Sequence, residues 1–358
     1  MVHTLEFYVN ITHVEKELVE RKHGQHIKGV IRKLERQFSK FNIRIGKPMW
    51  NGSYNIYLQF DAVELLGRTE DGEIVPDDYE LIQFHILELE HQLFDFPDRH
   101  FILNRIDYRV DLKVENKEHR KILFKLWRKI AKSYGHLKKR TKKNATREQK
   151  DGKEIYRSEK SYQTTIYLAS KSLVVCLYDK EEERRSKGME PLPYERNVIR
   201  FEVRLMRNHL AYKAREEKVY KDKNKKKKET RERSLEAYME KRCFDEYIKK
   251  YIVTIFGTED FHKLDVIKSK LIEAEIKNAQ RDKLINFINI IARAGVEGVI
   301  NYRGTKSKKK GSCSRYTMKR YRQILSELDI HIISLPLKTK GVGNILENPL
   351  GKWKMNNE

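Results

Sequence analysis

Cysteine is scarce in this 358-residue sequence, which has only Cys176, Cys243 and Cys313, all far apart. Because no CxxC pair is present, the sequence offers neither a disulfide framework nor a cysteine zinc site. The N-terminus lacks the basic start and apolar core of a signal peptide, and no apolar run is long enough to span a membrane. These absences predict a soluble, cytoplasmic protein of a reducing compartment that has no membrane partner.

Acidic residues are also few relative to basic ones. Asp and Glu together number 52, whereas Lys and Arg number 76, which gives a formal net charge of +24. Such an excess favours a polyanion as the partner, nucleic acid above all, over the near-neutral surface of an ordinary metabolic enzyme. Aromatic residues make up 10% of the chain, and alternating apolar runs recur along it, so the chain is not a wholly disordered basic tail.

Hydrophobic periodicity predicts both strands and helices in the first 135 residues. The helical range 13–38 ends in a basic face formed by Arg32, Lys33 and Arg36. The predicted strands are 3–10, 53–62 and 101–114, and the predicted helices are 13–38, 78–95 and 117–135.

Three further strand-like runs follow at 163–169, 173–179 and 198–206. Together with 101–114 they are expected to form one antiparallel sheet. After residue 230 the strand pattern fades, and the spacing of apolar residues predicts helices. These helices cover 234–256, 262–278 and 281–294.

Three basic stretches interrupt the pattern, at 137–150, 221–234 and 302–314. The first two have almost no apolar anchors, which is typical of a solvated loop or flexible tether. A loop that contacts phosphates along a DNA strand is the other interpretation. The two are compatible, because a solvated basic loop can become ordered on nucleic acid.

The C-terminal region resembles a winged or helix-turn-helix unit. Thr317 is expected to cap the N-terminus of a basic helix, MKRYRQILSELD, and the short run 330–335 is expected to be a strand. Along the whole chain, the predicted organisation is an N-terminal α/β portion at 1–98, a catalytic sheet portion at 99–220, a basic linker at 221–234 and a helical DNA-binding portion at 235–358.

Two of the predicted strands carry alternating charges of both signs. Side chains two residues apart in a strand lie on the same face, so the charged residues of each strand share one face. Such a face is ordinarily solvated. Acidic side chains interleaved with arginines on two strands also favour a second interpretation, because carboxylates bind hard divalent cations and arginines bind phosphate. The charged residues are Arg105, Asp107, Arg109 and Asp111 on one strand and Arg200, Glu202 and Arg204 on the other.

Tyr178 lies where an apolar strand ends and a highly charged segment begins. A tyrosine in a strand is more often part of the core or of its rim than a nucleophile. A free phenol, with a pKa of about 10, is a poor nucleophile at neutral pH. It needs a base or a nearby positive charge, which Lys180 or a metal ion could supply.

The sequence resembles the rolling-circle replication initiators. These include the filamentous-phage gene II proteins and the plasmid Rep-trans initiators and relaxases. The resemblance rests on three motifs in order: R-x-D at Arg105 and Asp107, Y-x-K-x-x-E at Tyr178, Lys180 and Glu183, and R-x-E at Arg200 and Glu202. It covers about residues 100–210 and, more faintly, 280–335. The tail SRYTMKRYRQILSELDI also resembles the C-terminal region of the gene II proteins.

The resemblance implies a role for each motif. Tyr178 takes the part of the nicking nucleophile, with Lys180 and Glu183 beside it in the catalytic site. Asp107 and Glu202 take the part of ligands to Mg²⁺ or Mn²⁺, and Asp111 is a further candidate. Glu183 could act as base, ligand or loop anchor.

The resemblance also implies a fold: an α+β nickase core with a central antiparallel sheet, and a helical C-terminal part. Many related nickases carry two histidines as His-hydrophobic-His. None of the twelve histidines here has that spacing, and His23 and His26 are expected to lie on the surface of an early helix. A carboxylate metal site is therefore implied instead.

The implied reaction is site-specific nicking and rejoining of one DNA strand through a 5′-phosphotyrosine intermediate. Arg105, Arg200 and Arg204 could contact the phosphate or pair with the neighbouring acidic side chains. Lys319, Arg320 and Arg322 are candidate contacts to duplex origin DNA, or solubilising residues of a packed helix. The nick site itself must be single-stranded or extruded. Host helicase and polymerase are further candidate partners, and the plasmid relatives imply a homodimer.

Two other functions are consistent with the composition. One is a non-catalytic, sequence-specific DNA-binding protein that uses the same basic surfaces. The other is an RNA-binding module in which the acidic side chains are only ion-paired.

Overall fold

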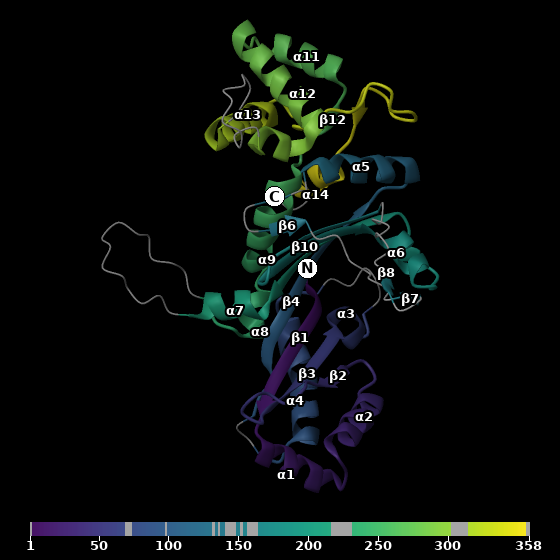
Figure 1. Ribbon diagram of the computed structural model, residues 1–358, viewed down its shortest axis with the longest axis vertical. Helices are drawn as coiled ribbons and strands as arrows, with labels where there is room; N and C mark the ends of the chain where they lie inside the picture. The colour runs from purple at the N-terminus through teal and green to yellow at the C-terminus, as the bar shows by residue number, and fades with distance from the viewer. Residues whose placement is uncertain are drawn as a thin grey trace, which may run out of the picture. The chain divides into compact units, whose positions relative to one another are not determined.

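The computed structural model describes residues 2–68, 74–96, 99–130, 133–134, 137–139, 148–150, 153–155, 164–215, 231–301 and 314–355 (Figure 1). Most of the basic stretches 137–150 and 221–234, and all of 302–314 except Ser314, lie outside these residues, so the interpretations of these stretches stay predictions.

The fold is α+β and is built on an antiparallel sheet, as the sequence predicts. The hydrogen-bonded order of its strands is β2-β3-β1-β4-β11-β10-β9-β6-β5. The strands predicted at 101–114, 163–169, 173–179 and 198–206 are therefore confirmed as neighbours in one sheet. Their bounds are β1 (Val2–Ile11), β2 (Asn42–Ile45), β3 (Tyr54–Asp61), β4 (Ile102–Lys113), β5 (Ser133–Tyr134), β6 (Leu137–Lys139), β9 (Thr165–Ala169), β10 (Leu173–Asp179) and β11 (Val198–Met206).

Two shorter antiparallel pairs accompany this sheet. Strand β7 (Glu148–Lys150) pairs with β8 (Lys153–Ile155), and β12 (Phe261–His262) pairs with β13 (Ile345–Leu346).

The chain forms two compact units, each assembled from several segments. The first contains 1–110, 171–174 and 202–248, and the second contains 111–170, 175–201 and 249–358. Strands β4, β10 and β11 contribute residues to both units. The four consecutive portions expected from the sequence stay a prediction.

In the first unit, strands β2, β3 and β1 form an antiparallel group in which Phe7 stacks on Phe60, with their rings 6.0 Å apart. On the other side of β1, Tyr108 of β4 is fully buried and donates a hydrogen bond to the carbonyl of Tyr238. The helices of this unit are α1 (His13–His23), α2 (Ile27–Gln37), α3 (Ala62–Leu65), α4 (Asp78–Leu93), α7 (Arg207–Ala214), α8 (Leu235–Met239) and α9 (Lys241–Ile248).

The predicted helix 13–38 is in fact two helices, α1 and α2. Gly24 ends α1 with a φ of +62°, a left-handed conformation that glycine adopts at little cost. Thr12 and Glu15 form a capping box at the start of α1. Apolar periodicity continues across this short turn, which is why the sequence pattern alone joins the two helices.

In the second unit, Trp127 of α5 packs edge-to-face on Phe201 of β11, and Phe256 packs on both rings. This aromatic cluster fixes α5 on the apolar face of the sheet. The helices of the unit are α5 (Lys117–Ile130), α6 (Lys180–Ser186), η1 (Pro193–Glu195), η2 (Lys249–Val253), α10 (Thr254–Phe256), α11 (Leu264–Glu273), α12 (Asn278–Asn301), α13 (Arg315–Glu327) and α14 (Pro349–Met355).

Helix α12 is kinked at Gly295, where the backbone has a φ of +70°. A Cβ atom at this position would lie 2.7 Å from the carbonyl oxygen of Lys129, so the close approach of α12 to α5 needs a glycine. The predicted helix 281–294 ends at this kink, whereas the helical segment continues to Asn301.

Several other predicted boundaries are wrong. The helix predicted at 117–135 ends at Ile130, and that predicted at 234–256 is divided into α8, α9, a π-helical turn (η2) and α10. Ser314, not Thr317, caps α13, because the hydroxyl of Ser314 accepts a hydrogen bond from the amide of Thr317. The run 330–335 is not a strand, and of its residues Leu335 alone forms an isolated bridge, to Lys263.

In the part of the chain that the structure describes, no helix combines the length and the apolar character needed to cross a membrane.

Candidate functional site

The three sequence motifs fall on strands that are consecutive in the sheet. R-x-D lies on β4, R-x-E lies on β11, and Tyr178 lies near the end of β10, in the hydrogen-bonded order β4-β11-β10. Strands β10 and β11 are consecutive in the chain, whereas β4 is distant from both, so the adjacency of β4 and β11 is a property of the fold.

The charged faces of β4 and β11 are buried where the motifs lie. Asp107 is 1% exposed, Arg200 is 2% exposed and Glu202 is 4% exposed. A solvated sheet face is therefore the wrong interpretation for these positions. Burying a charged side chain is costly unless the charge is paired or binds an ion, so each of these side chains is expected to have a partner of opposite charge.

In the first unit, Asp107 and Glu202 share one guanidinium. Arg204 donates to Glu202 over 2.6 Å from Nη2 to Oε2, and its Nε lies 3.6 Å from Oδ2 of Asp107. Arg105 also pairs with Asp107. Its Nε donates a hydrogen bond to Oδ1 over 2.7 Å, and its Nη2 donates a second one to Oδ2. The two predicted metal ligands thus converge on a single cation.

Burial raises the pKa of Asp107 to about 6, above its usual 3.8. Arg105 and Arg204 counteract this effect, whereas the neighbouring charge of Glu202 adds to it. A pKa perturbed by burial and neighbouring charges is a common property of functional carboxylates.

Carboxylate oxygens are the donors that Mg²⁺ and Mn²⁺ prefer, and Asp107 and Glu202 fit such an ion by their chemistry and their convergence. Both oxygens of Asp111 accept hydrogen bonds from Arg200, over 2.7 and 2.8 Å, and Asp107 is paired with Arg105 in the same way, so the role of Asp111 as a ligand stays a prediction. Among the described residues there is no group of three or more histidine, cysteine or acidic side chains placed to hold a metal.

Tyr178 is 8% exposed and lies in the second unit. A hydrogen bond from the amide of Met206 to the carbonyl of Ser172 fixes the antiparallel pairing of β11 with β10. Counting six residues back from Met206 and six forward from Ser172, without a bulge, places Arg200 directly opposite Tyr178. Residues opposite each other in a sheet point to the same face, so Arg200 and the predicted nucleophile share one face of the sheet.

The remaining residues of the Y-x-K-x-x-E motif begin α6. Asp179 caps this helix by accepting a hydrogen bond from the amide of Glu182. Lys180 lies 3.1 Å from Glu183 and 3.3 Å from Glu195, measured from Nζ to the carboxylate oxygens. Burial raises the pKa of Glu183, but Lys187 and Lys180 outweigh it and hold that pKa below its usual value. Glu183 is thus an anchored anion, which makes it a weak base.

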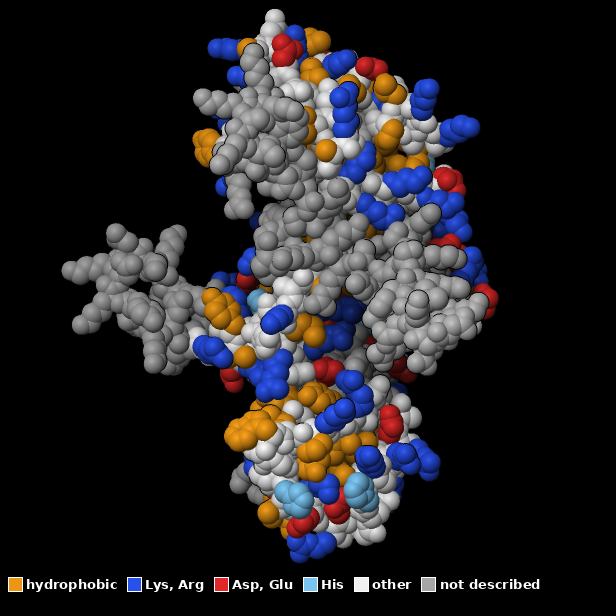
Figure 2. Space-filling view, in the orientation of Figure 1, with side chains coloured by type: hydrophobic (Ala, Val, Ile, Leu, Met, Phe, Trp, Pro, Cys, Tyr) orange, Lys and Arg blue, Asp and Glu red, His pale blue; other side chains and the backbone are white. Residues whose placement is uncertain are grey.

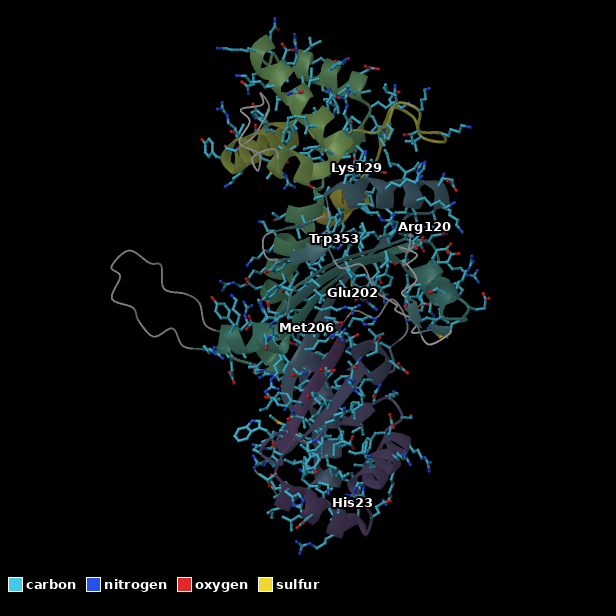
Figure 3. All side chains as sticks on the ribbon, viewed as in Figure 1. His23, Arg120, Lys129, Glu202, Met206 and Trp353 are labelled. Atoms are coloured by element: carbon cyan, nitrogen blue, oxygen red, sulfur yellow. The ribbon has the colours of Figure 1, made fainter. Side chains whose placement is uncertain are left out.

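Arg120 is a buried residue of this site that the sequence interpretation missed (Figure 3). It donates to Asp179, Glu181 and Asn197 and to the carbonyls of Val114 and Glu115. The residue after Tyr178 is therefore fixed to α5 and to the loop that follows β4. The sequence does indicate that Arg120 is buried. It lies in the same helical stripe as Leu123, Phe124 and Trp127, where an apolar residue is expected.

The predicted DNA contacts on α13 differ in their surroundings. Lys319 and Arg320 are exposed, whereas Arg322 is half-buried and donates a hydrogen bond to the carbonyl of Thr254 over 3.1 Å. Figure 2 shows that lysine and arginine side chains are spread over the visible face of both units.

No protein-family model matches this chain, and no curated protein matches it either.

Proposed function

We propose that this protein is a rolling-circle replication initiator that nicks and rejoins one strand of its origin DNA through Tyr178. The observation that carries the proposal is the adjacency of the three motif strands, with Arg200 opposite Tyr178. The pairing of β4 with β11 supports the proposal most, because it brings together two motifs that are far apart in the sequence.

The proposed step is a transesterification. The phenolic oxygen of Tyr178 attacks the phosphorus of the scissile phosphodiester, and its proton passes to a base or to water. The bond from phosphorus to the 3′ oxygen breaks, and that oxygen takes up a proton to become a free 3′-hydroxyl. The 5′-phosphate stays on Tyr178, so the energy of the phosphodiester is retained and the strand can be rejoined.

The buried arginines would assist this step electrostatically. A guanidinium beside Tyr178 favours the phenolate over the phenol, because an opposite charge stabilises the ionised form. The same group can donate two hydrogen bonds to a phosphate. We assign both roles to Arg200, and its pairing with Asp111 would orient it.

A divalent metal ion is part of the proposal. Asp107 and Glu202 would hold it, and it would supply charge neutralisation at the scissile phosphate. Since Arg204 contacts both carboxylates, the ion and this guanidinium compete for the same oxygens. Duplex origin DNA is proposed to bind at α13, with the nick site single-stranded or extruded.

The test is a suicide oligonucleotide that carries the origin of the element encoding the protein, labelled 3′ of the candidate nick. It is incubated with Mg²⁺ or Mn²⁺, and the products are separated on a denaturing gel. The proposal predicts a metal-dependent covalent band for the wild type and none for Tyr178→Phe. Tyr238→Phe is the matched control, because Tyr238 is also buried and its hydroxyl has no hydrogen-bond partner in the described structure.

One observation favours a non-catalytic DNA-binding protein as the second candidate. Arg105, Arg200 and Arg204 each pair with a carboxylate of the same face, and a purely structural network would be paired in the same way. In that case Tyr178→Phe leaves DNA binding intact and no covalent band forms for either protein. A band that persists in Tyr178→Phe would instead assign the nucleophile to another tyrosine.

A further inference from the structure

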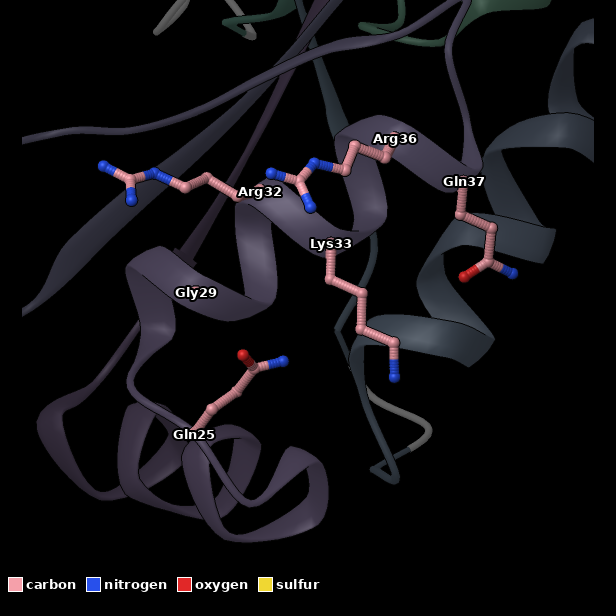
Figure 4. A pocket seen from close by; sticks show the side chains of 6 residues that line it. All are labelled: Gln25, Gly29, Arg32, Lys33, Arg36 and Gln37. Carbon is pink, nitrogen blue, oxygen red and sulfur yellow. The ribbon is translucent and has the colours of Figure 1, made fainter.

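Helix α2 of the first unit carries a basic hollow that the proposed nicking reaction does not use (Figure 4). The hollow has a volume of about 670 Å³, more than a single ion needs. Its lining residues are Gln25, Gly29, Arg32, Lys33, Arg36 and Gln37.

The sequence of α2 builds this face by amphipathic spacing. Ile27, Val30, Ile31 and Leu34 are buried in the unit, so the opposite stripe of the helix faces outward. Gly29 is one of the lining residues, and a Cβ atom there would lie 2.8 Å from Oε1 of Gln25. Glycine is less favourable than alanine inside a helix, and here it lets the Gln25 amide lie close to the first turn.

The cations of this face are not compensated. Arg32, Lys33 and Arg36 are exposed, and within the described part of the chain none of them forms an ion pair. The arginines on β4 and β11 contrast with them, because each of those pairs with a carboxylate. Three uncompensated cations on one stripe repel one another, and a polyanion would relieve this repulsion.

We propose that this face of α2 binds the backbone of duplex DNA. Arg32, Lys33 and Arg36 would contact phosphates, and the amides of Gln25 and Gln37 would contact phosphate oxygens or base edges. The proposal is independent of nicking, because it involves neither Tyr178 nor the buried charged face.

Geometry and chemistry favour duplex DNA over other anions. An α-helix is about 10–12 Å across, which fits a major groove of about 12 Å. Helix α2 is also the second helix of a pair joined by the three-residue turn 24–26, as in helix-turn-helix units. An anionic membrane fits less well, because the large apolar residues of α2 are buried and cannot anchor it in lipid.

The test compares two triple variants that lose the same net charge. The first is Arg32→Gln with Lys33→Gln and Arg36→Gln. The control is Lys241→Gln with Lys268→Gln and Lys352→Gln, three exposed lysines on α9, α11 and α14. Binding of a labelled duplex of about 20 base pairs, two helical turns without any origin, is measured by fluorescence anisotropy over a range of salt concentrations.

We expect the α2 variant to reduce the slope of log affinity against log salt by about 2–3, since each lost phosphate contact removes about 0.9. We also expect at least a tenfold loss of affinity at low salt, with little change in the control. Circular dichroism and a thermal melt check that both variants remain folded. If one variant does not fold, Arg36→Gln alone is compared with Lys241→Gln, with an expected slope change of about 0.9.

Two outcomes would overturn the proposal. One is an α2 variant that binds the duplex as the control does. The other is unchanged duplex binding together with a selective loss of binding to phosphatidylserine vesicles or to polyglutamate, which would assign the face to a membrane or to an acidic protein. Because the duplex contains no origin and no nick is measured, neither outcome depends on the role of Tyr178.

Discussion

At the scale of single residues, burial decides what the charged side chains of β4 and β11 do. Alternation in the sequence correctly places their charges on one face of each strand. It cannot say whether that face meets water, because this depends on chain segments packed over it from elsewhere. Buried as they are, Asp107 and Glu202 must each have a cationic partner, and arginines of the same face provide it.

Arg120 gives a testable prediction at the scale of single residues. Replacing Arg120 by Ala leaves the buried Asp179 without its cation and leaves Glu181 with Arg185 alone, so we expect the free energy of unfolding to fall by about 3–5 kcal/mol. Lys121→Ala is the control, because the exposed pair of Lys121 with Glu118 is worth at most about 1 kcal/mol. Urea unfolding of both variants measures the difference. Equal losses would mean that the contacts of Arg120 contribute nothing specific.

At the scale of elements, the sequence predicts the strands better than the helix ends. Period-two alternation locates β1, β3, β4, β9, β10 and β11 to within about two residues. Helix boundaries depend on single backbone conformations, such as the left-handed turn at Gly24, which periodicity does not reveal. The cap of α13 was misplaced for a related reason. Ser314 and Thr317 are both good capping residues, and hydrogen-bond geometry decides between them.

Helix α13 gives an element-scale prediction. Lys319 and Arg320 are exposed and suited to phosphates, whereas Arg322 holds α13 against the carbonyl of Thr254. Replacing Lys319 and Arg320 together by Ala should lower the salt dependence of binding to duplex DNA by about 2, at unchanged thermal stability. Arg322→Ala should instead lower the melting temperature by a few degrees. Anisotropy titrations and thermal melts of the same preparations distinguish the two effects.

If Arg322→Ala changes the salt dependence as strongly as the substitution of Lys319 does, the structural role given to Arg322 is wrong. If neither substitution affects DNA binding, α13 is a packed helix whose basic residues only increase solubility, which is the alternative that the sequence left open.

At the scale of the whole molecule, each compact unit contains a buried titratable group, and the two groups respond to pH in opposite directions. Burial raises the pKa of Asp107 in the first unit to about 6 and lowers that of His331 in the second to about 4. The neutral ring of His331 is held at both nitrogens. Nε2 donates to the carbonyl of Phe256 over 2.9 Å, and Nδ1 accepts from the amide of Ile333 over 3.0 Å.

The direction in which each group changes the stability with pH follows from proton binding in the native and unfolded states. Between about pH 4 and pH 6 native Asp107 binds a proton more tightly than the unfolded chain does, so its contribution to stability is lost as the pH rises. His331 is neutral in the native state while the unfolded chain is protonated, so its contribution is complete above about pH 6.5 and is lost as the pH falls toward 4. The pKa rises by about 2 for Asp107 and falls by about 2.5 for His331, and each change corresponds to roughly 3 kcal/mol.

Hydrogen exchange in a urea series, read by mass spectrometry on peptides from each unit, measures these contributions separately. The stability of the wild type relative to Asp107→Asn should decrease from pH 4 to pH 6 in peptides of the first unit. Relative to His331→Gln it should increase over the same range in peptides of the second unit. His85→Gln is a control for the histidine change, because the side chain of His85 is 33% exposed, whereas His331 is 1% exposed. If both differences changed with pH in the same direction, one of the two groups would not have the buried surroundings described here.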